Sequence, residues 1–215
     1  MLTIADIEPY IQKEFGSRLE QAGFNRLSNR RWIRSEKTAV REVFEIGLLK
    51  GGRYCPVWGF SSGFAPSFGR YEFRRQRTEK QATMDLIIDP VDITGVVPPQ
   101  AFRFITGADT QIPVGEICRA AEYFLPLAFA DFNRVRSAAD FCEFFLERSK
   151  LRYRRFRFDQ YFQHRLVLGF VLILMGQPSE GEQKIRQFCQ EMDLNFKDKI
   201  LTEYMSAARS YHMTV

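Results

Sequence analysis

Residues 40–60 constrain the fold more than any other stretch, because they carry the pattern of a β-hairpin. Apolar side chains occupy every second position on both sides of Gly51-Gly52, and strict alternation places them on one face of each strand. The alternating residues are Phe44, Ile46 and Leu48 before the glycines and Tyr54, Pro56, Trp58 and Phe60 after them. Glycine adopts the positive φ angles of a tight hairpin turn without steric cost. We therefore expect two long antiparallel strands here.

The first half of the chain is expected to add a helix and further strands to this hairpin. An amphipathic helix is predicted over 3–22, with Gly23 as its stop signal. Residues 61–69 are predicted to form a loop because Gly, Pro and Ser are dense there, and 89–115 a proline-rich connector with a short strand at 102–105. Three more strands are expected from their apolar and aromatic content: 26–34, 71–77 and 83–88.

The second half of the chain is predicted to be helical. Pro126 is expected to kink or split the first helix, and Ser137 followed by Asp140 has the spacing of a helix capping box. The turn Gly-Gln-Pro-Ser at 176–179 predicts that the helices on either side of it lie antiparallel. The predicted helices are 116–132, one that begins at Ser137, 159–175, 179–192 and 196–211.

Together these elements predict an α+β fold. An N-terminal helix packs on an antiparallel four- to five-stranded sheet, and an all-helical C-terminal half follows. We place the boundary between residues 1–112 and residues 113–215, which form either two domains or one continuous domain. The chain of 215 residues contains 21 phenylalanines, which indicate aromatic-rich packing between the sheet and the helices.

Composition indicates the cellular compartment in which the protein acts and the class of partner that it can bind. The net charge of +5 permits an anionic partner without requiring one. The four cysteines form no Cys-x-x-Cys pair and no secretory leader precedes them, so we expect reduced thiols in a cytoplasmic protein. The longest apolar run, 166–175, has about half the length that a membrane-spanning helix needs. No membrane partner is therefore expected.

One motif matches a catalytic pattern. Gly59-x-Ser61-x-Gly63 has the spacing of a nucleophile elbow, in which a strand turns sharply into a helix and exposes the serine. A strand is predicted before this motif, but the residues that follow it are not helical, and the base would have to be His164 or His212. We favour a glycine–serine loop over a serine hydrolase, and we predict no catalytic residues.

Metal-ligating residues are sparse in this sequence. Its two histidines and four scattered cysteines lack ligand spacing. Asp85, Asp89 and Asp92 form the densest acidic group, which suits a hard cation such as Mg²⁺ but is more typical of a solvated turn at a strand end. We predict no metal and no cofactor.

Basic residues interleaved with aromatic ones are the most suggestive functional signal. The densest run spans 148–158. In many proteins that bind single-stranded nucleic acid, arginines contact the phosphates and aromatic rings stack on the bases. Two further groups are Arg70, Arg74, Arg75, Arg77 and Lys80, and Arg26, Arg30, Arg31 and Arg34. On adjacent strands these two groups would form one positive sheet face.

The same residues also have a structural interpretation. Arginine stems cover apolar surface while their charged heads stay in water, and nearby Glu or Asp residues can pair with them. The phenylalanines of loop 59–69 either fold back onto the sheet or form a binding lip. The candidate binding residues are Arg148, Lys150, Arg152, Tyr153, Arg154, Arg155, Arg157, Arg74, Arg75, Arg77 and Phe64.

Two runs near the N-terminus carry a family resemblance. LEQAGFNRLSNRRWIRS places Leu-x-x-x-Gly-Phe at a helix end before an Arg- and Trp-bearing strand, and REVFEIGLL follows as an aromatic strand. Over residues 15–68 this pattern resembles certain uncharacterised bacterial families, some of which are encoded near polymorphic toxins and are suspected immunity proteins. The resemblance implies a toxin-neutralising role and supplies no catalytic residues.

The sequence therefore favours a non-enzymatic, cytoplasmic bacterial binding protein with a protein partner, of which an immunity protein is one form. The first alternative is a nucleic-acid-binding protein that uses the arginine and aromatic clusters. The second alternative is a serine hydrolase that uses Ser61.

Overall fold

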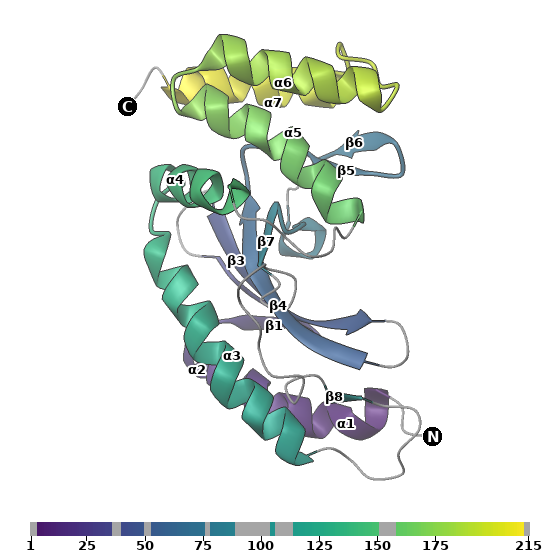
Figure 1. Cartoon of the computed structure of the whole chain (residues 1–215), viewed down its shortest axis with the longest axis vertical. Helices are drawn as coiled ribbons and strands as arrows, with labels where there is room; N and C mark the ends of the chain where they lie inside the picture. Colours follow the sequence, from purple (N-terminus) through teal and green to yellow (C-terminus); the bar gives the residue numbers. More distant parts are fainter. Residues whose placement is uncertain are drawn as a thin grey trace.

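The computed structural model describes residues 4–35, 40–49, 53–75, 78–88, 104–105, 114–150 and 158–212. In this part of the chain an antiparallel sheet is flanked by helices, which confirms the α+β class (Figure 1). The strands are β1 Asn25–Ser28, β2 Arg31–Arg34, β3 Val40–Leu49, β4 Arg53–Ser62, β5 Ser67–Gly69, β6 Glu72–Arg74, β7 Leu86–Ile88 and β8 Phe104–Ile105. The α-helices are α1 Ile4–Ile11, α2 Ser17–Gln21, α3 Val114–Arg134, α4 Ala138–Ser149, α5 Phe158–Leu174, α6 Pro178–Glu191 and α7 Lys199–His212. A π-helical turn, η1 Gln12–Gly16, joins α1 to α2, and a 3₁₀ turn, η2 Glu79–Gln81, precedes β7.

The predicted hairpin is the centre of the main sheet. Strands β3 and β4 pair along their whole length, and Phe44 lies opposite Trp58. The strand order is β1-β2-β3-β4-β7, with β8 paired to the beginning of β4. Pairing places Trp32, Phe44, Trp58 and Ile88 in one row across four strands, and all four are buried. Gly51-Gly52 lies outside the described residues.

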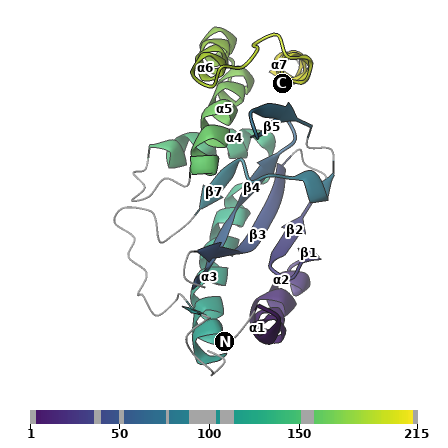
Figure 2. The same cartoon turned by 90° about the vertical axis from the view of Figure 1, so that its right-hand side faces the viewer.

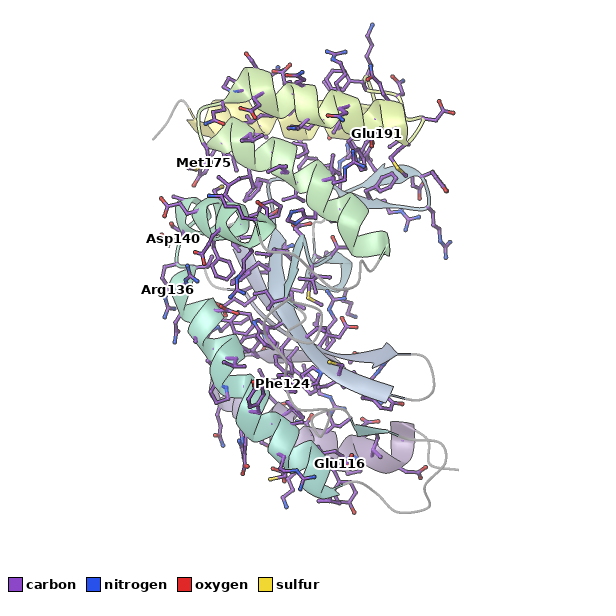
Figure 3. The ribbon with its side chains drawn as sticks, in the orientation of Figure 1. Glu116, Phe124, Arg136, Asp140, Met175 and Glu191 are labelled. Carbon is purple, nitrogen blue, oxygen red and sulfur yellow. The ribbon has the colours of Figure 1, made fainter. Side chains whose placement is uncertain are left out.

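Two helical segments cover the face of the sheet that carries this row. From η1, the Phe15 ring lies 5.7 Å from the ring of Phe44, measured between centroids. From α3, which runs along the side of the sheet, Phe124 projects toward Trp58 with 6.4 Å between ring centroids (Figure 3). Figure 2 shows α3 running along the sheet and α1 near the lower end of the sheet. The aromatic-rich packing that the phenylalanine content predicts is thus present.

Several predicted elements of the first half are wrong in detail. The strands expected at 71–77 and 83–88 are shorter than predicted, as β6 and β7. Residues 26–34 form not one strand but the hairpin β1–β2, in which Asn29 and Arg30 make the turn. Residues 67–69, predicted as loop, form β5, which pairs only with β6 in a separate two-stranded sheet. Local composition marks a turn-rich stretch, but strand pairing is decided by contacts that composition does not encode. The short strand expected within 102–105 is confirmed as β8.

The helical half follows the sequence closely, with one difference at Pro126. The proline does not split α3, which is continuous from Val114 to Arg134. Pro126 is exposed, so water can reach the carbonyl group that the missing N–H leaves free. The predicted cap of α4 is confirmed, because Ser137 Oγ accepts a hydrogen bond of 3.1 Å from Asp140 N. The Asp140 carboxylate in turn accepts from Arg136 N at the α3–α4 junction (Figure 3).

Helices α5 and α6 form the predicted antiparallel pair (Figure 1). Gly176, with φ of 80°, ends α5 in a Schellman motif, in which Gln177 N donates to Leu172 O at 2.9 Å. The helices cross closely at Gly169 and Gly181, where a Cβ on Gly169 would lie 2.8 Å from Gly181 O. Glycine is required at this crossing because no side chain fits between the backbones.

One hydrophobic core crosses the boundary that the sequence suggests at residue 112. The ring of Phe60 on β4 contacts Phe132 of α3 and two rings of α4, with centroids 5.7 Å from Phe132, 6.1 Å from Phe141 and 5.6 Å from Phe144. These residues belong to a single buried cluster that extends to α5, α6 and α7. Such a shared core favours one continuous domain over two.

Candidate binding site on the β5–β6 hairpin

The β5–β6 hairpin has an unusual turn. Gly69 pairs with Glu72, which leaves Arg70 and Tyr71 as a two-residue loop. Both residues have positive φ angles, 53° for Arg70 and 61° for Tyr71. This combination belongs to a type I′ turn, where Asn-Gly is the preferred sequence. An L-residue other than Gly, Asn or Asp pays roughly 1–2 kcal/mol for the left-handed conformation. We call Arg70 and Tyr71 the hairpin tip.

The hairpin tip is highly accessible. Tyr71 exposes 74% of its surface, more than any other large hydrophobic residue in the described part of the chain. Arg70 is also exposed, and it makes no hydrogen bond or ion pair with the residues that the structure describes. A bulky aromatic ring and a free guanidinium group therefore stand together at the end of a strained turn.

Aromatic residues that pack against the core hold the base of the hairpin. Phe68 and Phe73 pair across β5 and β6, with ring centroids 5.8 Å apart. Phe68 also packs edge to face on Phe188 of α6 at 5.1 Å. Figure 1 shows the hairpin beside α5 and apart from the main sheet. The side chains on one face of the hairpin thus belong to the core, whereas the hairpin tip does not.

Gln163 of α5 fixes the approach to the hairpin. Its carboxamide oxygen accepts from Phe68 N at 2.8 Å, and its nitrogen donates to Pro66 O at 3.1 Å and to Asp85 Oδ1 at 2.5 Å. Asp85 also accepts from the backbone N–H and the hydroxyl of Ser62, at 2.5 and 2.6 Å. This buried network joins α5, the end of β4 and the beginning of β5, so the hairpin stands on a rigid base.

Acidic side chains from β6 and α7 pair with the arginines at the second strand of the hairpin. Arg74 pairs with Glu72 on the same strand, and Arg75 pairs with Glu203 of α7 at 2.5 Å. Both arginines were candidate binding residues, and the structure places them next to the hairpin tip with their charges matched. The third candidate of this group, Arg77, lies outside the described residues.

Phe64 takes the folded-back arrangement rather than that of a lip. It is partly buried, and its ring lies 5.5 Å from Phe141 of α4 in an edge-to-face contact. Phe60 and Phe68 of the same stretch also pack into the core. The binding surface that three phenylalanines among glycines and serines would offer is therefore not formed by these rings.

Arg148 is part of the fold. Its Nη2 donates to Asp131 Oδ1 at 2.6 Å, and Asp131 Oδ2 accepts from the indole N–H of Trp58 at 2.9 Å. The guanidinium group also lies 5.0 Å from the centre of the Phe144 ring. Only 17% of the Arg148 side chain is exposed. Its charge is therefore used between α3, α4 and β4, which gives Arg148 a structural role, and its assignment as a binding residue stays a prediction.

The rest of the basic run is only partly described. Lys150 is exposed at the end of α4. The other candidates of this run, Arg152, Tyr153, Arg154, Arg155 and Arg157, lie outside the described residues. Their assignment as binding residues stays a prediction.

A single positive sheet face does not form. The N-terminal arginines lie in the main sheet, whereas Arg70 and Arg74 belong to the separate β5–β6 pair, so the two groups are not on adjacent strands. Several of these arginines also have carboxylate partners: Arg26 with Glu8, Arg31 with Glu45 and Arg34 with Glu42. The expectation of one shared positive face is wrong because it assumed a single sheet.

The serine motif does not form a nucleophile elbow. Ser61 lies inside β4 with no exposed surface, and a bend followed by β5 comes after it instead of a helix. His164, one possible base, is stacked on Phe145 with 4.3 Å between ring centroids. Burial lowers the pKa of His164 to about 4. A substrate cannot reach Ser61 in this arrangement.

The acidic group near residue 85 does not present a metal site in the described structure. Asp85 is directed into the hydrogen-bond network of Ser62 and Gln163, and Asp89 and Asp92 lie outside the described residues. Among the residues whose placement is given, no three His, Cys, Asp or Glu side chains group together as metal ligands. None of the described helices is long and apolar enough to cross a membrane.

Sequence reasoning missed Tyr71 as a functional candidate. The available signal was the spacing of Phe68 and Phe73, which brackets four residues and fits a two-residue turn between short strands. This signal was masked because neither Arg nor Tyr is a typical residue of such a turn.

Fold and site together define an α+β protein that presents a firmly anchored hairpin with an exposed Arg–Tyr end. Comparisons with protein-family models, curated proteins and solved structures find no match to this chain.

Proposed function

We propose that this chain is a non-enzymatic binding protein whose partner is another protein, and that the hairpin tip makes the central contact. The observation that carries the proposal is the 74% exposure of Tyr71 in a left-handed turn beside the unpaired Arg70. Tyrosine and arginine are among the residue types that most often dominate the binding energy of protein interfaces. A soluble fold gains nothing in stability from an exposed ring on a strained turn, so a contact outside the chain accounts for it best.

The anchored base supports the same proposal. Gln163, Phe68 and Phe73 hold the hairpin in one position before any partner arrives. A contact that is already ordered loses less conformational entropy on binding, which increases affinity. The hairpin tip therefore has the properties of a preformed recognition element.

The family resemblance suggests what kind of partner this is. We propose that the protein acts in the bacterial cytoplasm, and that an immunity-type role, in which it binds and neutralises a toxin, is one form of this function. An interaction protein of this kind needs no catalytic group. The buried position of Ser61 supports a non-enzymatic role over that of a serine hydrolase.

The charge distribution favours a protein over a nucleic acid. Arginines on several elements are matched by carboxylates, among them Arg134 with Glu147, Arg165 with Glu191 and Arg209 with Glu182. A nucleic-acid interface presents a continuous positive surface to the phosphates. In the described part of the chain these arginines instead have acidic partners.

Comparative affinity capture tests the proposal. The full chain, immobilised at equal amounts as the natural sequence, as Tyr71→Ala and as Tyr211→Ala, is exposed to lysate of the cells that express it. Tyr211 is a suitable control because it is a tyrosine on α7 with 48% exposure. We expect a protein that the natural sequence and Tyr211→Ala retain and that Tyr71→Ala loses. The proposal fails if Tyr71→Ala retains the same proteins, or if nuclease treatment of the lysate removes them all.

A further inference from the structure

We infer that the partner of the hairpin tip presents an acidic protein surface, in which an apolar pocket receives the Tyr71 ring and a carboxylate beside it pairs with Arg70. This inference rests on the proposed function and specifies the chemistry of the same site. It follows from the charges along the hairpin, from the backbone of the turn and from the way the base is held.

Arg70 differs from the other arginines of this region. Arg74 is paired with Glu72, and Arg75 with Glu203. Arg70 has no such partner among the described residues, although Glu72 is only two positions away. Arg70 and Tyr71 are exposed, whereas Phe68 and Phe73 of the adjoining strands pack against the core. A carboxylate from outside the chain would complete the pairing that the neighbouring arginines already have.

The neighbouring acidic residues distinguish a protein from a nucleic acid. Glu72 exposes 58% of its side chain and Glu203 45%. A nucleic-acid strand passing over Arg70 carries a phosphate in its backbone at every nucleotide, so it would bring further phosphates near these two carboxylates, and like charges repel. A polypeptide carries its carboxylates at the ends of flexible side chains, which can turn away from Glu72 and Glu203. A protein surface can place a carboxylate opposite Arg70 and a neutral or basic group opposite Glu72. The mixed charge of the hairpin is therefore matched by a protein with an acidic centre.

The backbone of the turn gives the contact its shape. Because Arg70 and Tyr71 both have positive φ, their side chains leave the hairpin in directions that a turn with ordinary φ angles does not produce. The ring contact of Phe68 with Phe188 and the hydrogen bond that Gln163 accepts from Phe68 N keep the strands beneath the turn in place. An aromatic ring held in this way at the end of a rigid hairpin fits a pocket better than a flat surface.

Site-resolved titration of the full chain tests this inference without the natural partner. The probes are poly-L-glutamate, as an acidic polypeptide, and oligothymidylate of matched charge, as a nucleic acid, each added to ¹⁵N-labelled protein at low salt. We expect poly-L-glutamate to shift the amide signals of residues 69–75 most strongly. Arg70→Gln should raise the apparent Kd for this probe about threefold to fivefold, because one exposed ion pair is lost.

A matched variant controls for net charge. Arg119→Gln removes the same charge from an exposed position on α3 and should leave the titration at residues 69–75 unchanged. The inference is overturned if Arg70→Gln and Arg119→Gln weaken the binding of poly-L-glutamate equally. It is also overturned if oligothymidylate shifts the amide signals of residues 69–75 as strongly as poly-L-glutamate does.

The two experiments can fail separately. A partner that depends on Tyr71 in the capture experiment, together with no response to poly-L-glutamate, would keep the proposed function and reject the acidic surface. A response to poly-L-glutamate at the hairpin, with no Tyr71-dependent partner, would locate an acidic site and reject the proposed function.

Discussion

The indole N–H of Trp58 donates a 2.9 Å hydrogen bond to Asp131, and this bond joins the centre of the sheet to α3. Trp32, in the same cross-strand row, is equally buried, but its indole N–H has no hydrogen-bond partner within the described residues. The two tryptophans thus fill similar core positions and differ in whether their polar atom is satisfied.

This difference predicts unequal effects of the same substitution. Trp58→Phe removes packing and leaves an oxygen of buried Asp131 without its donor, whereas Trp32→Phe removes packing and an unsatisfied donor. We expect Trp58→Phe to lower the free energy of unfolding by about 1–3 kcal/mol more than Trp32→Phe does. Urea denaturation of both variants measures the difference. Equal losses, or a larger loss for Trp32→Phe, would show that the hydrogen bond to Asp131 contributes nothing.

Arg148 predicts a stability effect rather than a binding effect. Removing its side chain leaves Asp131 buried with only the Trp58 indole N–H as a donor among the described side chains, and we expect Arg148→Ala to cost about 3–5 kcal/mol of unfolding free energy. The exposed pair of Arg134 with Glu147 is the control, and Arg134→Ala should cost less than about 1 kcal/mol. Similar small losses for both variants would mean that Arg148 is a surface residue, as the sequence pattern alone suggested.

Two glycine substitutions, one at the crossing of α5 and α6 and one on α3, should change the free energy of unfolding in opposite directions. Gly169→Ala would place a methyl group 2.8 Å from Gly181 O and should destabilise the protein by about 1–3 kcal/mol. Gly115→Ala, in the first turn of α3, has no atom within 4 Å of the added methyl group. It should stabilise by up to about 1 kcal/mol because alanine favours the helix. Thermal unfolding of the two variants compares the signs, and a neutral Gly169→Ala would contradict the close crossing.

His164 predicts a loss of stability in mild acid. Burial lowers its pKa in the folded state to about 4, against an ordinary value of 6.5. The unfolded chain therefore binds the proton first as the pH falls. The contribution of neutral His164 to the free energy of unfolding is fully present above pH 6.5. It declines by at most about 3 kcal/mol as the pH falls toward 4. His164→Gln should flatten the dependence of unfolding free energy on pH between 6.5 and 4. An unchanged slope would assign the acid sensitivity to other groups.

Much of the fold follows from local patterns in the sequence. The alternation around residues 44–58, the cap at Ser137 and the turn at Gly176 each depend on residues a few positions apart, so composition and spacing suffice to predict them. The helices of the second half are long and periodic, and for this reason their approximate bounds could be predicted.

The candidate site depends on contacts that local patterns do not contain. Gln163 reaches the loop before β5 from nearly a hundred residues away in the sequence, and Asp131 joins Trp58 to Arg148 across three elements. A run of arginines has the same appearance in a sequence whether its charges are free or paired in the fold. The structural role of Arg148 was therefore not predicted, and the exposed hairpin tip was not recognised.

The turn itself offers the most direct test that the hairpin tip serves binding at the expense of stability. In the double variant Arg70→Asn/Tyr71→Gly, the preferred type I′ sequence replaces two residues in left-handed conformations. We predict that the unfolding free energy rises by about 1–2 kcal/mol while the protein retained in affinity capture by the natural sequence is lost. A double variant that is more stable and still retains this partner would contradict the central claim, and so would one that is less stable than the natural sequence.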